Sequence, residues 1–483
     1  MTPEVNPVTP AVFRPIWILL LLVALPAVCP GGGHAAAPAR APNFVVIFCD
    51  DMGYADIGPF GAKRYKTPNL DRMASEGMVF TSFCVARSVC SPSRAALMTG
   101  CYPVRVGVPG NFGPSSKTGL HPEEMTIAEV VKQKKYAAGM YGKWHLGHRP
   151  KFQPTSQGFD DWFGLPYSND MWPYHPETGT RFRFPDLPLI ENGKVLNPKV
   201  LPKDQVHLTT WYNDRAVKFI EKNRDRPFLL YLPHAMPHVP LFVRKESEGR
   251  SGAGLYGDVI GEIDTGVGRI LDTLRRLDLD KNTLVIFTSD NGPWLLYGDH
   301  AGAAGPLREG KSTPFEGGFR VPCVMWWPGR IPAGSRCAEL ASTIDILPTV
   351  AHLGGMPLPK RKIDGKNIWP LMSGEPGAKT PHEAFFYYSG SKLSGVRSGR
   401  WKLLFPQGFV QQKPPGKGGQ PGTRARGEIP LSLFDLEKDV GEKDNVAAAN
   451  PEVVKRLEGL AEAMRKKLGD TGRGGSEIRP VGR

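Results

Sequence analysis

The residue types that most clearly suit chemistry lie between Cys90 and Gly100. This stretch reads Cys90-Ser-Pro-Ser-Arg94-Ala-Ala-Leu-Met-Thr-Gly100. Ser91 can cap a helix, Pro92 suits a first helical position and Gly100 suits an end, so the stretch predicts a short helix. Residue 90 then lies at the positive end of that helix, where backbone N–H groups favour an anion. Arg94 lies one turn further on and can point back to the same place. The alternative is a buried structural cysteine before a helix.

Two pairs of residues with oxygen-bearing side chains directly follow apolar runs of the chain. Asn43–Cys49 precedes Asp50-Asp51, and Thr283–Ser289 precedes Asp290-Asn291. Runs of this length, apolar on both faces and rich in Val, Ile and Phe, are typical of central strands in a mostly parallel sheet. Sites in such folds gather beyond the carboxyl ends of the strands. Taken alone, the first pair fits a helix cap or turn equally well, and Asp290-Asn-Gly fits a hairpin turn.

Taken together, these segments resemble the sulfatase family. Cys90-X-Pro-X-Arg94, followed by Ala-Ala-Leu-Met-Thr-Gly, is similar to the signature in which the cysteine is oxidised to formylglycine (3-oxoalanine). Over roughly residues 42–405 further segments match in chain order: Asp50-Asp51, Gly142–Gly147, Pro166–Asp170, Pro237–Pro240, Asp290–Gly292, Gly310-Lys311 and Glu316–Gly318. Each motif is weak alone, whereas the ordered set is highly specific. The chain is identified as a member of the formylglycine-dependent type I sulfatases, in the branch of arylsulfatase A and N-acetylgalactosamine-6-sulfatase.

The resemblance implies a single calcium ion in the site. Its expected ligands are Asp50, Asp51, Asp290, Asn291 and the formylglycine formed from Cys90. The four unmodified side chains offer oxygen donors, and hard oxygen ligands select Ca²⁺ or Mg²⁺ over zinc. A two-zinc phosphatase is disfavoured, because Asn291 stands where a zinc site would be better served by histidine.

The resemblance also assigns the remaining site residues. Catalytic roles fall to Cys90, Arg94, Lys143, His145, His238 and Lys311, and substrate binding to Ser168, Lys143, His238 and Lys311. Cleavage of a sulfate ester places negative charge on the sulfuryl and leaving oxygens, so it needs fixed cations more than a strong base. His234 also follows an apolar run, but the family spacing selects His238.

The mechanism that the family implies runs through residue 90. The hydrated aldehyde attacks sulfur in line while Asp290 takes its proton, and His238 or Lys311 protonates the departing alcohol. His145 then helps the second hydroxyl to expel sulfate and regenerate the aldehyde.

The elements that must position these residues alternate between strand and helix. Besides the two runs above, Phe228–Leu232 predicts a strand, and helical patterns span 125–133, 211–223 and 256–277. Such alternation indicates an α/β fold. We expect an alkaline-phosphatase-like sandwich whose central, mostly parallel sheet is covered by helices.

The residue pattern changes after about residue 378, from alternating strands and helices to short strands joined by turns. Short strands at 385–388, 395–397 and 401–405, followed by an amphipathic helix at 451–468, predict a smaller C-terminal antiparallel sheet with a terminal helix. The expected divisions are a signal peptide at 1–37, a catalytic domain at 38–378, the small domain at 379–470 and a frayed tail at 471–483.

The N-terminus predicts export. Ile16–Leu25 is an apolar run preceded by Arg14 and followed by Ala35-Ala-Ala37, which is the pattern of a cleaved secretory signal. Pro26 stops the run short of a membrane span, so we expect no stable membrane insertion. A lipoprotein signal ending at Cys29 fits less well. The mature protein is therefore expected in the periplasm or outside the cell.

Bulk composition narrows the class further. A chain of 483 residues with 40% hydrophobic and 22% charged residues is globular rather than disordered or fibrous. The formal charge is +14, and residues 391–430 hold eight Lys or Arg against Glu428 alone, which indicates a solvated basic surface or steering of a polyanionic substrate. No basic helix or aromatic-basic motif predicts a nucleic-acid partner. If Cys90 is committed to chemistry, five cysteines remain beyond Cys29, and an odd number cannot all pair.

The expected function is hydrolysis of sulfate monoesters, with aryl sulfates as test substrates and a sulfated sugar or glycolipid in nature. The expected partners are the sulfated small molecule or glycan and the formylglycine-generating enzyme. Two alternatives stay open: a formylglycine-dependent phosphonate or phosphodiester hydrolase, and an inactive sulfated-glycan binding protein in which Cys90 is never oxidised. The loops around 170–210 and 405–428 match no interpretable motif, so the natural substrate is not readable from the sequence.

Overall fold

The structure, a computed structural model, describes residues 1, 3–4, 7, 10–11, 40–175 and 183–483. The predicted signal at 1–37, with Cys29, falls almost entirely outside the described residues and stays a prediction. Residues 40–483 form one compact unit. Within the described part of the chain, no helix has the length and apolar character needed to cross a membrane.

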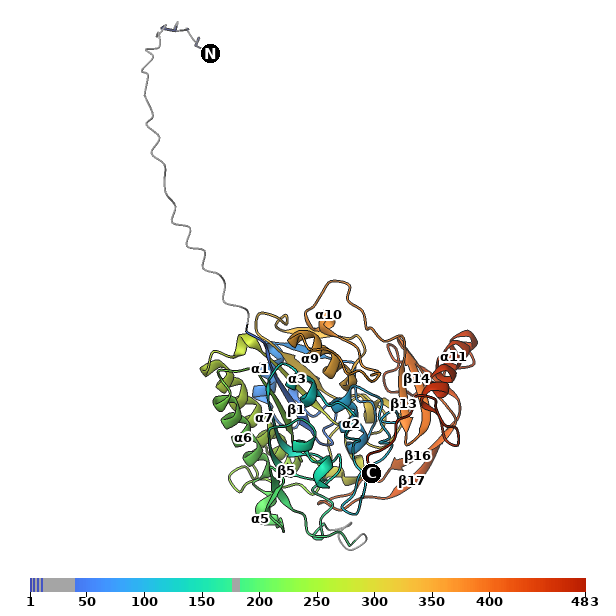
Figure 1. Cartoon of the computed structure of the whole chain (residues 1–483). Coiled ribbons are helices and arrows are strands. Elements are labelled where there is room, and N and C mark those ends of the chain that lie inside the picture. Colours follow the sequence, from blue (N-terminus) through green and yellow to red (C-terminus); the bar gives the residue numbers. More distant parts are fainter. Residues whose placement is uncertain (2, 5–6, 8–9, 12–39, 176–182) are drawn as a thin grey trace. The chain divides into compact units, whose positions relative to one another are not determined.

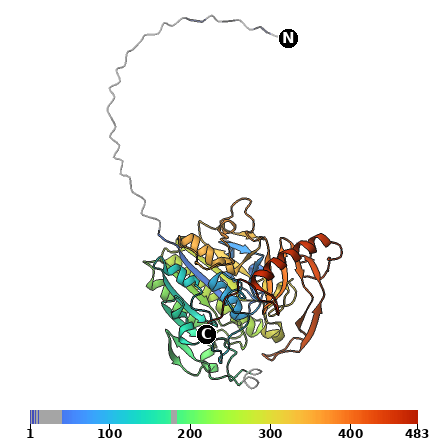
Figure 2. The ribbon, with the colours of Figure 1, turned by 45° about the vertical axis from the view of Figure 1, so that its right-hand side comes forward.

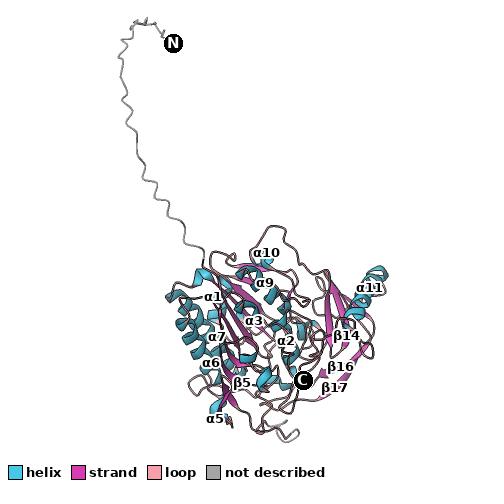
Figure 3. Cartoon of the chain, viewed as in Figure 1, coloured by secondary structure: helices cyan, strands magenta, loops and turns pink. Residues whose placement is uncertain are grey.

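A sheet of 10 strands lies at the centre of this unit, in the order β11-β2-β10-β9-β1-β8-β4-β5-β6-β7 (Figure 1, Figure 3). Strands β9, β1, β8, β4 and β5 run parallel, and β10, β6 and β7 add antiparallel pairings. The mostly parallel sheet predicted from the apolar runs is confirmed. The strands are β1 (Asn43–Cys49), β2 (Met78–Phe80), β4 (Ala137–Lys143), β5 (Asp161–Leu165), β6 (Leu189–Glu191), β7 (Lys194–Asn197), β8 (Phe228–Pro233), β9 (Thr283–Ser289), β10 (Cys323–Trp326) and β11 (Ser335–Cys337).

Helices cover both faces of the sheet, which is why the central strands are apolar on both sides. Along β1, Phe44, Val46 and Phe48 pack into one core, and the alternate residues Val45 and Ile47 pack into the other. The first face carries α2 (Cys90–Thr99), α3 (Ile127–Lys132) and α9 (Ile346–Gly354). The second carries α1 (Pro68–Ser75), α6 (Leu208–Lys222) and α7 (Gly254–Arg276).

Shorter elements complete the larger part of the chain, which precedes β13. β3 (Phe83–Cys84) pairs with β12 (Ala341–Ser342) in a small parallel sheet. The short helices are α5 (Pro202–Gln205), α8 (Glu316–Phe319) and α10 (Trp369–Met372). Short 3₁₀ segments lie at η1 (Gly58–Phe60), η2 (Pro150–Phe152), η3 (Pro154–Ser156), η4 (Asp280–Asn282), η5 (Leu295–His300) and η6 (Thr343–Asp345). The six described cysteines are free thiols.

The C-terminal part forms the predicted antiparallel sheet and helix (Figure 2). Its strands follow the order β13 (Phe385–Ser389), β14 (Lys392–Ser398), β15 (Trp401–Leu404) and β18 (Ser432–Asp435), and α11 (Pro451–Leu468) packs on β14 and β15. A separate hairpin joins β16 (Gln407–Gln412) to β17 (Arg424–Ile429).

The last residues differ from the frayed tail expected from the sequence. The Arg479 backbone N–H donates to the Arg105 carbonyl at 2.7 Å, and Gly482 pairs with Gly119. The carboxylate of Glu477 lies 2.7 Å from the Arg105 guanidinium. Polar partners earlier in the chain, at Arg105 and Gly119, therefore hold these last residues, which have few apolar side chains of their own.

A buried ionic cluster links the C-terminal sheet to the larger part of the chain that precedes it. The ammonium of Lys402, a fully buried residue, lies 3.0 Å from Glu316 and 2.8 Å from Glu442. The buried guanidinium of Arg397 lies 3.5 Å from Glu316. Burial raises the pKa of Glu442 to about 7, whereas Lys402 and Arg397 outweigh the opposing effect of burial on Glu316 and lower its pKa to about 2. Two basic residues expected on the solvated surface are thus buried, because carboxylates far away in sequence pair with them.

We expect Lys402→Met to destabilise the fold by about 3–5 kcal/mol, because it leaves two buried carboxylates short of their shared cation. Urea unfolding measures this free energy. Lys455→Met, at an exposed position on α11, is the control and should shift it by less than about 0.5 kcal/mol. Equal small shifts for both variants would show that the buried cluster does not hold the two parts together.

Candidate active site

The helix that carries Cys90 is set by its packing. α2 begins at Cys90 and ends at Thr99, and it is capped by Gly100, whose φ of 67° is left-handed and whose N–H donates to the Ala96 carbonyl. Ser91 is not the cap that the sequence predicts, because its hydroxyl accepts from the Phe112 N–H at 3.2 Å while Val89 occupies the cap position. The helix begins two residues earlier than predicted, at Cys90 rather than Pro92, but residue 90 still lies at its N-terminal end as expected.

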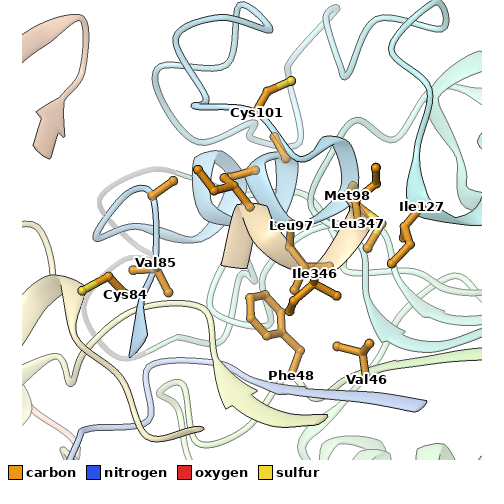
Figure 4. Packing of buried hydrophobic residues seen from close by; sticks show 14 of the residues in the cluster. Val46, Phe48, Cys84, Val85, Leu97, Met98, Cys101, Ile127, Ile346 and Leu347 are labelled. Atoms are coloured by element: carbon orange, nitrogen blue, oxygen red, sulfur yellow. The ribbon is translucent and has the colours of Figure 1, made fainter. Parts of the chain in front are cut away.

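Apolar side chains fix α2 against the sheet (Figure 4). Leu97 and Met98 belong to the same buried cluster as Phe48 of β1. Ile346 and Leu347 of α9 pack beside them in that cluster. The N-terminus of α2 is thereby held over the carboxyl end of β1.

Asp50-Asp51 and Asp290-Asn291 meet because β1 and β9 are neighbouring parallel strands in register. Cys49 lies opposite Ser289 in this pairing. The Asp51 N–H donates to Asp290 Oδ1 at 3.1 Å, and Asn291 Nδ2 donates to Asp51 Oδ1 at 2.7 Å. Asp51 has a φ of 62°, a strained conformation of the kind that gathers at functional sites.

Two of the predicted cations hold these carboxylates. Nε and Nη2 of Arg94 donate to Asp290 Oδ2 at 3.0 and 2.8 Å, and Nη2 also lies 3.5 Å from Asp50. Lys143, the last residue of β4, pairs with Asp50 and donates to the Ser168 hydroxyl at 3.1 Å. The lysine is brought there because β4 ends at the same edge of the sheet.

Lys311 and His238 approach Asp51 together. The Lys311 ammonium lies 2.8 Å from the Asp51 carboxylate, and His238 Nε2 lies 3.5 Å from it. His238 Nδ1 lies 2.6 Å from the Val239 carbonyl, which can only accept, so Nδ1 donates and Nε2 faces the acid. The Trp294 ring covers both, with its centre 4.4 Å from Lys311 Nζ and 5.4 Å from the His238 ring.

Cys90 is a protonated thiol in this setting. The residue is 1% exposed, and Sγ lies 3.4 Å from Asp50 Oδ1. Burial raises the pKa of the thiol well above its usual value, and the charge of Asp50 raises it further. A thiol rather than a thiolate is a weak nucleophile, so the unmodified side chain is poorly suited to attack.

His145 is held as a neutral acceptor. Nε2 lies 2.9 Å from the Phe112 carbonyl and must donate to it, which leaves Nδ1 without a proton. Nδ1 is buried and has no hydrogen-bond partner within the described residues. Burial, reinforced by the charge of Lys143, lowers the pKa of His145 well below its usual value.

Two residues near the site were not predicted from the sequence as members of it. Asp170 is partly buried, and although burial opposes the effect, His238 and a hydrogen bond from Ser168 lower its pKa. Asp170 ends the motif Pro166–Asp170, and Trp294 follows the motif Asp290–Gly292. Nearness to a motif is the only feature of the sequence that could have pointed to these two residues. His234, set aside at the start, is buried with neither ring nitrogen bonded in the described structure.

The structure brings together side chains that could hold a metal ion. Asp50, Asp51, Cys90 and His238 each place one ligand atom within 4.8 Å of the others. Asn291 adds a buried Oδ1 with no hydrogen-bond partner among residues 40–175 and 183–483. His238 was not among the predicted ligands, and the predicted ligand Asp290 is occupied by Arg94 and the Asp51 N–H.

Mutual repulsion among the carboxylates gives this set a need for positive charge. Burial raises the pKa of Asp290 to about 7, and the neighbouring Asp50 adds to the rise. Burial would raise the pKa of Asp50 too, but Lys143 and Arg94 outweigh it and hold that pKa well below its usual value.

The family models and known relatives agree with this geometry. The family described as "Sulfatase" matches residues 42–356, and the one described as "C-terminal region of aryl-sulfatase" matches 380–475. Human arylsulfatase A is 40% identical over 452 residues, covering 88% of each chain, and N-acetylgalactosamine-6-sulfatase from Canis lupus familiaris is 37% identical, covering 94% of this chain and 90% of its own. The solved PsFucS1 sulfatase from Pseudoalteromonas sp. superposes with a TM-score of 0.79 at 26% identity, covering 88% of this chain and 90% of its own. The chain therefore belongs to the sulfatase family of enzymes.

Proposed function

We propose that the protein hydrolyses sulfate monoesters through a formylglycine formed from Cys90. The observation that carries the proposal is the buried thiol of Cys90, whose pKa is raised. It lies beside Asp50, and the positive charges of Lys143 and Lys311 act on it. An unmodified thiol in that state is a poor nucleophile, and fixed cations around it suit an anionic substrate. Once oxidised and hydrated, residue 90 offers two hydroxyls on one carbon, one to take the sulfuryl group and one to expel it.

Arg94, Lys143 and Lys311 then stabilise the charge that grows on the sulfuryl and leaving oxygens. Ser168 orients Lys143 by accepting its hydrogen bond and is itself a substrate contact in the proposal. Because these groups are held by buried carboxylates, they need little reorganisation when a substrate enters.

Proton transfers fall to side chains with defined donors and acceptors. Asp290 accepts the proton of the attacking hydroxyl. His145 Nδ1, a bare acceptor, takes the proton of the second hydroxyl when sulfate is expelled. The Lys311 ammonium protonates the departing alcohol, or His238 does so as an imidazolium, in which Nε2 also carries a proton.

The residues fit one calcium ion, with magnesium as the other hard candidate. Asp50, Asp51, Asp290, Asn291 and the oxygen of the modified residue 90 would hold it. When bound, the ion supplies positive charge that offsets the repulsion among the carboxylates and attracts a sulfate oxygen. The unpartnered Asn291 Oδ1 supports this assignment.

The natural substrate class proposed is a sulfated sugar or glycolipid, with aryl sulfates as laboratory substrates. The relative named N-acetylgalactosamine-6-sulfatase supports the sugar. The proposal includes oxidation of Cys90 by a formylglycine-generating enzyme, and export directed by residues 1–37.

Removal of the metal tests the cation site. We expect exhaustive chelation to abolish aryl sulfatase turnover and to lower the melting temperature, because a ligand at a hundred times its Kd stabilises the fold by about 2.7 kcal/mol. Calcium should restore both, and Asp51→Ala should remove the calcium-dependent shift. Full activity and an unchanged melting temperature after chelation would rule out the site.

Substitution of the lysines tests charge stabilisation. Lys143→Ala and Lys311→Ala should each reduce kcat about a hundredfold or more, because the charge that they stabilise develops in the transition state. Lys455→Ala, at an exposed position, should change neither kcat nor KM. A fall confined to KM would show that the lysines only bind the substrate.

The state of residue 90 tests the nucleophile. Active protein should yield a peptide in which the Cys90 sulfur is replaced by a carbonyl oxygen, and turnover should track the modified fraction across preparations. Cys90→Ala should fold, bind calcium and be inactive. Full turnover by a preparation whose Cys90 is entirely a free thiol would refute the mechanism. Comparing aryl sulfate with aryl phosphonate turnover separates the sulfatase from the phosphonate hydrolase.

A further inference from the structure

The loop formed by residues 105–119 contacts the active site at its middle. The Phe112 carbonyl accepts from His145 Nε2 at 2.9 Å, and the Phe112 N–H donates to the Ser91 hydroxyl at 3.2 Å. The Asn111 side chain accepts from the Ser91 N–H at 2.9 Å. Two consecutive loop residues therefore contact both the start of α2 and the histidine to which the proposed mechanism gives sulfate release.

The 105–119 loop has little regular structure to keep these atoms in place. Residues 100–126, all of which the structure describes, contain no helix or strand. Near the middle of the loop is a turn, in which the Gly113 N–H donates to Ser116 Oγ and the Ser116 N–H donates to the Gly113 carbonyl. A loop of this kind keeps a fixed shape where other parts of the chain hold it.

Segment 477–482 holds the 105–119 loop at both ends. At the first end, the Arg479 N–H donates to the Arg105 carbonyl at 2.7 Å. At the second end, Gly482 and Gly119 exchange two backbone hydrogen bonds of 3.0 and 3.1 Å. One short segment, far along the chain, is thus bonded to both ends of the loop that reaches the active site.

Ion pairs reinforce the first end. The Arg105 side chain is 2% exposed, and its guanidinium lies 2.7 Å from the carboxylates of both Glu477 and Asp364. The Arg479 guanidinium lies 2.8 Å from Glu124. Hydrogen bonds between guanidinium and carboxylate groups are among the stronger ones in proteins, so this end of the loop is firmly held.

Close packing reinforces the second end. A Cβ added at Gly482 would lie 2.6 Å from Phe152 Cε1 and 2.9 Å from the Gly119 carbonyl oxygen. The Phe152 carbonyl accepts at 2.7 Å from the indole N–H of Trp144, the residue that precedes His145. Segment 477–482 therefore packs against both stretches of the chain that surround this histidine.

We propose that residues 477–482 are positioning residues for sulfate release. By holding both ends of the 105–119 loop, they keep the Phe112 carbonyl on His145 Nε2. Because a carbonyl can only accept, this contact fixes the orientation of the imidazole and the proton on Nε2, and it leaves Nδ1 as the acceptor. The inference rests on the proposed function, since it assigns the segment to one of its two half-reactions.

The positioned nitrogen acts in one defined step. His145 Nδ1 takes the proton of the free hydroxyl on residue 90, and the oxygen of that hydroxyl becomes the carbonyl oxygen of the aldehyde. The bond from the same carbon to the sulfate oxygen breaks, and its electron pair leaves with sulfate. Sulfuryl transfer does not use Nδ1, and Leu97 and Met98 hold α2 in the core independently of the loop. Loosening the loop should therefore slow sulfate release and spare sulfuryl transfer.

Single-turnover kinetics with the oxidised protein in excess over a radiolabelled aryl sulfate tests this assignment. Gly482→Ala places a Cβ against Phe152 and Gly119 and should push the segment away from the loop. We expect it to slow the appearance of free sulfate about tenfold or more, while phenol forms within about twofold of the wild-type rate. The label should meanwhile accumulate on the peptide that contains residue 90. Gly474→Ala is the matched control, because an added Cβ there meets nothing within 4 Å, and it should change neither rate.

A second variant guards against misfolding of the first. Glu477→Gln removes a charge beside Arg105 without adding atoms to the packed interface, and it should slow sulfate release alone, by about threefold. Unchanged sulfate release by either folded variant would overturn the proposal. So would equal slowing of both steps, which would show that the segment only stabilises the fold. Failure of the oxidised wild-type protein to form phenol would instead refute the proposed function itself.

Discussion

The structure depends on three carboxylates that are buried together at one edge of the sheet. Asp50 and Asp51 directly follow β1, and Asp290 directly follows the adjacent parallel strand β9, so sheet register forces them into contact. Burying like charges is strongly unfavourable unless cations pair with them. Arg94 and Lys143 meet this need from α2 and β4, so the placement of each element is tied to the charge balance at this edge.

The same pairing explains how one cluster serves both stability and chemistry. Buried carboxylates hold the cations in fixed positions, which is the preorganisation that a developing sulfuryl charge requires. A divalent ion bound by the carboxylates would take over their neutralisation and leave Arg94, Lys143 and Lys311 to face an anionic substrate. Trp294, packed against Lys311 and His238, limits the room around two of these groups.

The sequence predicts what is local or carried by ordered motifs. The runs that became β1, β8 and β9 are apolar because both faces are buried, and the signature around Cys90 locates α2. Long-range pairing is not readable in this way. From the sequence, Lys402 is expected at the surface, whereas in the structure it is buried and paired with Glu316 and Glu442. Ser91 does not cap the helix, because its hydroxyl accepts a hydrogen bond from the backbone N–H of Phe112, a loop residue outside the helix.

Sulfuryl transfer to residue 90 is the central claim, and a Cys90→Ser protein tests it most directly. Serine has one hydroxyl, so it can accept the sulfuryl group but has no second hydroxyl on the same carbon to expel it. With a radiolabelled aryl sulfate, the account predicts release of about one equivalent of phenol, with the label fixed on the peptide that contains residue 90. Continued turnover by this variant with no label on that peptide would contradict the account.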